Sequence, residues 1–222
     1  MSGPADRLAR FFTPADLAAI EAAVREVEAR TAGELVPYAV GQSDAYARAA
    51  WTAATLGALG GGLVAALVHT LGHEWGLDPA LWMALPPAAG AALGWLAVVA
   101  VPGLRRALVP AEVLDHRVRQ RATAAFVAEE VFRTRDRTGI LLFLSVFERR
   151  VLVLADVGIA ARVAQREWDE IATAIAAGIR RGAPGPALAA GIRRCGELLA
   201  TRVPVAPADR DELPDQLRTD PS

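Results

Sequence analysis

Three carboxylates stand at the ends of apolar segments that have the length and composition of β-strands. Glu34 begins the segment ELVPYAV, Asp136 precedes GILLFLSV, and Asp156 ends RVLVLAD. If the first two strands run parallel and the last two form a hairpin, all three carboxylates lie at the same edge of one sheet. Oxygen ligands suit calcium, and Arg135 or Arg137 beside them could hold a phosphate oxygen. The alternative is that these are solvated charges at strand ends.

The remaining reactive side chains favour structural roles. His69 and His73 have the i, i+4 spacing that can present two nitrogens on one helix face, but Glu74 lies outside the pair. We therefore interpret them as interfacial histidines at a helix end. Cys195 falls on the apolar stripe of a predicted helix, where a free cysteine behaves as a small hydrophobic residue. Ser145 has no histidine near it in the sequence, so no catalytic serine arrangement can be argued.

Periodicity predicts the elements that must position these residues. Thr13, Pro14 and Asp16 have the spacing of a helix start. Pro37 in the segment 34–40 suggests an edge strand or a bulge. Segments 139–146 and 150–156 are almost continuously apolar, which predicts central strands with both faces covered. Helical patterns occupy 13–32, 110–133 and two segments after residue 160. The predicted fold class is α/β, with a single sheet and helices on both faces.

An apolar insert interrupts this polar body. Residues 49–104 carry two charges, Glu74 and Asp78, whereas the other 166 residues carry 47 of the 49 charges. Runs of 25 and 26 uncharged residues lie on either side of these acids. A spanning helix needs roughly 20 apolar residues, so we expect a transmembrane hairpin with helices at about 51–72 and 80–103. The alternative is a buried core hairpin of a soluble protein.

Small residues and flanking charges refine the prediction of a membrane hairpin. Gly57 and Gly60–62 in the first run would let the two helices approach closely, and Pro86 and Pro87 would kink the second. Arginines flank the hairpin, at Arg48 and at 105–106, while its loop carries acids only. The positive-inside rule then places both termini and the α/β domain in the cytoplasm, at the inner (plasma) membrane.

The predicted domain organisation has four parts. Residues 1–48 form the first part of the α/β domain, 49–104 the transmembrane hairpin, 105–203 the second part of the domain, and 204–222 a flexible tail. The formal net charge is −1 and the sequence pI is about 6.3. Neither value is typical of a nucleic-acid-binding protein, which usually has a strong basic excess. We therefore expect no nucleic acid as a partner. The apolar insert predicts the lipid bilayer as one.

Several short motifs give the chain a family resemblance. They are Thr31-Ala32-Gly33-Glu34 before the first strand, Asp136-Arg137-Thr138-Gly139 before the second, and Gly158-Ile159 followed by the helix that holds Trp168. On these motifs the chain resembles the TPM-domain family, named from a thylakoid acid phosphatase, a photosystem repair protein and a receptor modulator. The resemblance covers about residues 13–50 and 111–203, and it is greatest to a bacterial branch in which two spans interrupt the domain after its first strand.

Two functional hypotheses follow. The first is a membrane-anchored, non-catalytic module that binds another membrane protein, in its assembly or quality control. The second, implied by the resemblance, is a membrane-anchored phosphatase that depends on a divalent cation, with calcium as the candidate and Glu34, Asp136 and Asp156 as its ligands. The second hypothesis requires these carboxylates to converge within a few ångströms of one another.

Overall fold

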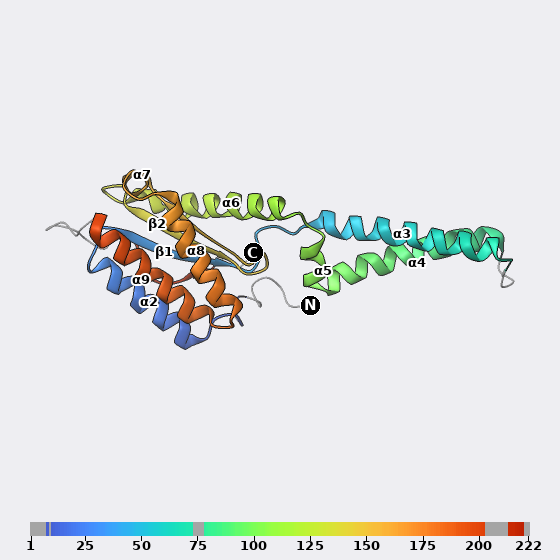
Figure 1. The fold of residues 1–222 in the computed structure, drawn as a ribbon, viewed down its shortest axis with the longest axis horizontal. Helices are drawn as coiled ribbons and strands as arrows, with labels where there is room; N and C mark the ends of the chain where they lie inside the picture. Colours follow the sequence, from blue (N-terminus) through green and yellow to red (C-terminus); the bar gives the residue numbers. More distant parts are fainter. Residues whose placement is uncertain (1–7, 9, 73–77, 203–212, 220–222) are drawn as a thin grey trace. The chain divides into compact units, whose positions relative to one another are not determined.

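Figure 1 shows a computed structural model of the 222-residue chain, which describes residues 8, 10–72, 78–202 and 213–219. The helices are α2 (Pro14–Glu28), α3 (Ala47–Thr70), α4 (Pro79–Ala100), α5 (Pro102–Ala107), α6 (Ala111–Ala128), the 3-10 helix η1 (Val131–Arg133), α7 (Val157–Ala160), α8 (Gln165–Arg180) and α9 (Pro184–Arg202). The strands are β1 (Glu34–Val40), β2 (Gly139–Ser145), β3 (Arg150–Ala155) and β4 (Arg218–Thr219). The chain divides into two compact units, one made mainly of residues 44–114 and the other of residues 2–43 and 115–222.

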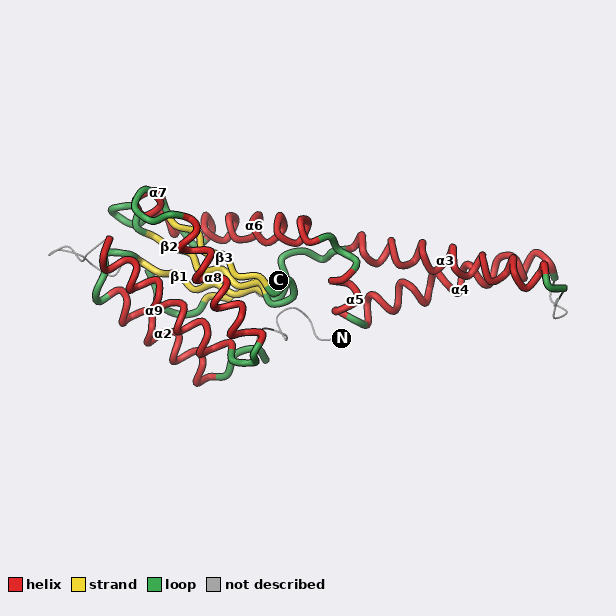
Figure 2. The backbone as a smooth tube through the Cα atoms, viewed as in Figure 1, coloured by secondary structure: helices red, strands yellow, loops and turns green. Residues whose placement is uncertain are grey.

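The larger unit is an α/β domain built on one four-stranded sheet with the order β3-β2-β1-β4. Figure 2 shows β1, β2 and β3 of this sheet with helices around them. Strands β1 and β2 are parallel, with Glu34 opposite Gly139 and Val40 opposite Ser145, and β2 and β3 are antiparallel. The predicted hairpin of the last two strands is therefore confirmed, and the parallel pairing that was assumed for the first two is present. No bulge occurs at Pro37, which lies opposite Leu142 in the continuous β1–β2 register.

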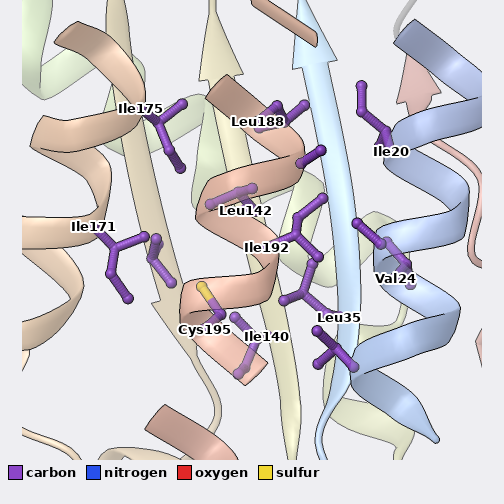
Figure 3. Packing of buried hydrophobic residues seen from close by; sticks show 14 of the residues in the cluster. Ile20, Val24, Leu35, Ile140, Leu142, Ile171, Ile175, Leu188, Ile192 and Cys195 are labelled. Carbon is purple, nitrogen blue, oxygen red and sulfur yellow. The ribbon is translucent and has the colours of Figure 1, made fainter. Parts of the chain in front are cut away.

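Both faces of the sheet are covered by helices, as the continuous apolar strands predicted. One face carries alternate strand residues such as Leu35, Ile140 and Leu142, which pack against α2, α8 and α9 (Figure 3). The other face carries the residues between them, such as Leu141 and Phe143, which pack against the side chains of α6 and η1. Every residue of β1 and β2 is buried. Successive side chains of a strand point to opposite faces of the sheet, and here each face is covered by a layer of helices.

The helix start at Thr13 has the predicted capping box. The Thr13 Oγ1 accepts a hydrogen bond from the Asp16 backbone N–H at 3.1 Å, and the Asp16 carboxylate accepts one from the Thr13 N–H at 2.9 Å. Helix α2 then buries Ile20, Val24 and Val27. Each of the two side chains thus accepts a hydrogen bond from a backbone N–H that would have no partner at an uncapped helix end.

Part of the predicted flexible tail is a strand. β4 pairs in parallel with β1, Arg218 opposite Tyr38 and Thr219 opposite Ala39. The Arg218 guanidinium forms an ion pair with Glu129 at the end of α6, and Leu217 packs on the core. These contacts have no local sequence pattern, which is why composition alone suggested a tail. Residues 203–212 and 220–222 of that segment lie outside the described residues.

The smaller unit contains α3 and α4, which pack along each other as a helical hairpin. Helix α3 begins at Ala47 and α4 ends at Ala100. The second helix was expected to reach residue 103, but Pro102 instead opens the short helix α5. Helix α4 continues through Pro86 and Pro87. Both long helices have the length and the apolar composition to cross a membrane.

Candidate functional site

The N-terminal edge of the parallel strands gathers two of the three predicted carboxylates. The Glu34 N–H donates to the Thr138 carbonyl at 3.2 Å, and the Asp156 N–H donates to the Gly139 carbonyl at 2.9 Å. The start of β1, the start of β2 and the residue after β3 are therefore adjacent along this edge. Asp136 lies in the loop before β2, and its side chain is exposed.

The Asp156 carboxylate is occupied by two local partners. Its Oδ2 accepts from the Arg137 Nε at 2.5 Å and its Oδ1 accepts from the Arg137 Nη2 at 2.9 Å, a bidentate ion pair. Oδ1 also accepts from the Val157 N–H at 2.7 Å, so that Asp156 caps α7. The Asp156 side chain is 4% exposed, while that of Arg137 is half exposed. The hydrogen bond to Asp156 raises the pKa of the Arg137 guanidinium.

The loop that carries Arg137 is held against α7. A Cβ on Gly158 would lie 2.5 Å from the Asp136 carbonyl oxygen and 2.6 Å from that of Arg137, so only glycine allows this approach. Arg137 itself has a φ of 57°, in the left-handed region that favours glycine. The sequence suggested that Arg137 could hold a phosphate oxygen, but in the structure it holds Asp156. Gly158 and Arg137 therefore serve to fix the end of β3.

Glu34 belongs to a different carboxylate group. It is buried, with 8% of its surface exposed, and it lies near Glu28, whose Oε1 accepts from the Leu35 N–H at 2.9 Å. Burial, with smaller contributions from the charges of Glu34 and Asp215 and from a hydrogen bond to Asp215, raises the pKa of Glu28 from 4.5 to about 9. The hydrogen bond from Leu35 opposes this shift.

The predicted trio does not form a metal-binding group. Within the part of the chain that the structure describes, no three His, Cys, Asp or Glu side chains are gathered so that they could hold a metal ion. Asp156 is paired with Arg137, Asp136 is exposed, and Glu34 lies near the half-buried Glu28. The shared sheet edge was predicted correctly, but it does not bring these three side chains to one point.

The C-terminal edge of the same strands carries a buried polar network that sequence reasoning missed. The Glu148 carboxylate accepts from the Ser43 N–H at 2.8 Å and from the Ser145 hydroxyl, and the hydroxyls of Ser43 and Ser145 are 2.8 Å apart. Ser145 and Glu148 are fully buried. This network joins the loop after β1 to the β2–β3 turn. The signal available in the sequence was a serine that ends an apolar strand, followed three residues later by a glutamate.

A cavity of about 530 Å³ adjoins this network in the α/β domain. Ser145, Arg149 and Val151 line it from the β2–β3 hairpin, and Ile179 and Arg180 line it from the end of α8. Arg149 has a φ of 56°. In sheets of parallel strands, ligands commonly bind outside the carboxyl ends of the strands, and the cavity lies at the carboxyl end of β2.

Of the other singled-out residues, Cys195 has the packing role that the sequence favoured. Cys195 is fully buried in the core between α9 and the sheet, and burial raises the pKa of its thiol to about 12. It is a packing residue with an inert thiol. His69 is exposed in the last turn of α3. His73 and Glu74, the other residues of that predicted group, lie outside the described residues.

Comparison with known proteins yields one solved structure. No protein-family model and no curated protein matches the chain. The chain is similar in fold to the NMR structure of the BA42 protein from the psychrophilic bacterium Bizionia argentinensis. The similarity has a TM-score of 0.58 and 19% sequence identity, and it covers 96% of this chain and 98% of BA42. At this level of identity the likeness concerns the fold alone.

Proposed function

We propose that this chain is an integral membrane protein of the TPM kind, in which the α3–α4 hairpin crosses the inner membrane twice. The observation that carries this proposal is the exposure of the hairpin's large apolar side chains. Leu63 exposes 72% of its surface and Met83 exposes 74%. A core hairpin of a soluble protein would bury such side chains in its own domain, whereas a lipid-facing hairpin leaves them outward.

The inward side of the hairpin fits lipid packing as well. A Cβ on Gly57 would lie 2.0 Å from the Gly90 carbonyl oxygen, and one on Gly61 would lie 2.1 Å from that of Pro86. The helix backbones therefore touch, as small residues allow in membranes. The 24 residues of α3 and the 22 of α4 correspond to lengths of about 36 Å and 33 Å, enough for about 30 Å of hydrocarbon.

The charges beside the hairpin support a cytoplasmic α/β domain. Arg48 lies in the first turn of α3, and Arg105 and Arg106 lie in α5 after the second apolar helix. The connecting loop carries Glu74 and Asp78 and no arginine. Because basic residues stay on the cytoplasmic side, this arrangement favours an outer loop and a domain that faces the cytoplasm.

The α/β domain then serves as a binding or assembly module for another membrane protein. Support comes from the contacts that its candidate catalytic side chains make within the domain. Asp156 is engaged with Arg137 and α7, and the predicted calcium ligands do not converge. These observations favour the binding role over the phosphatase hypothesis. A rigid domain on a double anchor is suited to contact proteins that emerge from the same bilayer.

Membrane insertion and sidedness are tested in whole cells and in vesicles. The full chain should float with liposomes and resist carbonate extraction. In a Cys195→Ala background, Thr70→Cys at the end of α3 should react with an impermeant maleimide in intact cells, whereas Ala111→Cys should react only after permeabilisation. A chain that stays soluble without detergent would refute the anchor, and the opposite labelling pattern would refute the orientation.

The binding role is tested by exchanging the anchor. Residues 47–107 are replaced by an unrelated two-span hairpin, and crosslinked complexes are purified from solubilised membranes. If the α/β domain binds the partner, the same membrane protein is recovered with the foreign anchor. If recovery requires the native hairpin, the domain is not the binding element. An Asp136→Asn variant serves as the control, because this exposed carboxylate should not affect the interaction.

A further inference from the structure

The cavity at the carboxyl end of β2 combines two arginines with apolar walls. Arg149 comes from the β2–β3 turn and Arg180 from the last turn of α8, while Leu144, Val151 and Ile179 supply apolar surface. These residues all belong to the α/β domain. The chemistry of the cavity is therefore a property of that domain alone and does not depend on the hairpin.

Neither arginine is neutralised by an ion pair within the described residues, unlike many others in the same domain. Arg150, the next residue, pairs with Asp115 at 2.6 Å, and Arg193 pairs with Glu26 at 3.0 Å. Arg149 and Arg180 form no such contact there. Two guanidinium groups at one cavity without carboxylate partners repel each other and attract an anion.

Glu148 precedes Arg149 in the chain and belongs to the buried polar network described above. Glu148 does not line the cavity, and its carboxylate is taken up by the Ser43 N–H and the Ser145 hydroxyl. The network joins the β2–β3 turn to the loop after β1. Arg149 itself has a left-handed backbone conformation, with a φ of 56°, which a non-glycine residue adopts at some cost. Such costs concentrate at functional sites.

We propose that this cavity binds a small amphiphilic anion. Arg149 and Arg180 hold its oxyanion headgroup, a phosphate or a carboxylate, and its short apolar body lies against Leu144, Val151 and Ile179. The volume of about 530 Å³ is in the range of small-molecule sites. The proposal adds a small ligand to the domain and is independent of the membrane-protein partner proposed above.

The test uses the full chain in nanodiscs of a zwitterionic lipid, with empty nanodiscs as the blank. Hexyl phosphate and heptanoate are titrated by calorimetry, and the stronger of the two identifies the headgroup. Hexanol, which keeps the apolar body without the charge, should bind at least about tenfold more weakly, because it cannot form charge-assisted hydrogen bonds with the two guanidinium groups. Equal binding of hexanol, or binding of neither anion beyond the blank, would overturn the proposal.

Variants assign the binding to the two arginines. Arg180→Gln and Arg149→Asn should each weaken binding of the better anion about tenfold. Asparagine is chosen for position 149 because it tolerates a left-handed backbone. Arg149→Lys keeps the charge and should retain most of the affinity, which separates loss of charge from loss of fold. Arg181→Gln, the exposed neighbour outside the cavity, is the matched control. Unchanged binding in Arg180→Gln, or an equal loss in Arg181→Gln, would contradict the assignment.

Discussion

Leu63 in the α3–α4 hairpin exposes 72% of its surface, whereas Leu142 in the α/β domain exposes none. The closest contacts differ in the same sense. In the hairpin, backbone meets backbone at Gly57 and Gly90. In the domain, branched side chains from the sheet and from three helices fill one core (Figure 3). One chain therefore follows two packing rules: the domain buries branched apolar side chains, and the hairpin brings two backbones together at small residues, as helices in lipid do.

The largest effect should come from deleting the same side chain in both regions. Leu142→Ala removes a fully buried side chain from the centre of the sheet and should lower the free energy of unfolding by about 2–5 kcal/mol. Leu63→Ala removes a side chain that contacts little protein and should change it by less than about 0.5 kcal/mol. Urea unfolding of the full chain in detergent, followed by hydrogen exchange in β2 and α3, measures both. Similar losses in both variants would mean that the hairpin is packed as a soluble core.

The second comparison enlarges a side chain instead of removing one, at the interface between the two helices of the hairpin. Gly57→Leu places a Cβ 2.0 Å from the Gly90 carbonyl oxygen, so the helices must separate, at a cost of about 1–3 kcal/mol. A Cβ at Gly60 would meet no atom within 4 Å, so Gly60→Leu is the matched control, with no measurable loss expected. The thermal midpoint of α3 and α4, read by hydrogen exchange in nanodiscs, distinguishes the two. A loss for Gly60→Leu equal to that of Gly57→Leu would refute the assigned interface.

The third comparison stays within the α/β domain and separates a buried from an exposed acid. Asp156→Asn weakens the bidentate pair with Arg137 and should cost about 1–2 kcal/mol of the domain's stability. Asp136→Asn changes an exposed side chain and should cost less than about 0.5 kcal/mol. Denaturant titrations of the full chain measure both. If calcium raised the unfolding midpoint of the wild type and this gain were lost in both variants, the hypothesis of a calcium site at these carboxylates would be favoured instead.

The difference between the two regions also explains what could be predicted from the sequence. The hairpin could be predicted because its two long apolar runs are continuous in the chain. The sheet could be predicted because its strands are short and apolar throughout, as their burial between two helix layers requires. The common edge of Glu34 and Asp156 followed from strand direction alone. Strand direction does not specify where side chains point. The Arg137–Asp156 pair, the contacts of Ser43 with Ser145 and Glu148, and the pairing of β4 with β1 all join residues that are well separated in the sequence, where no local period exists to reveal them.

The smallest expected effect is a pH dependence that separates the two regions again. Between Arg48 and His69, and throughout α4, the hairpin helices contain no ionisable side chain, whereas the α/β domain holds Glu28 with a pKa raised to about 9, chiefly by burial. The folded domain keeps the Glu28 proton that the unfolded chain releases above about pH 4.5. The domain's stability should therefore fall as the pH rises from about 4.5 to about 9.

Glu28→Gln removes this titration while keeping a side-chain oxygen that can accept from the Leu35 N–H. We expect the variant to be the more stable protein at pH 8 and to lose less stability between pH 5 and 8. The gain should stay below about 1 kcal/mol, because Glu28 is partly exposed and water screens it. Unfolding midpoints at the two pH values, read from β1 amides, provide the measurement, with Glu21→Gln on the exposed side of α2 as the control. If Glu28→Gln and Glu21→Gln had the same pH slope, the raised pKa of Glu28 would be wrong and the domain would bury no proton that the hairpin lacks.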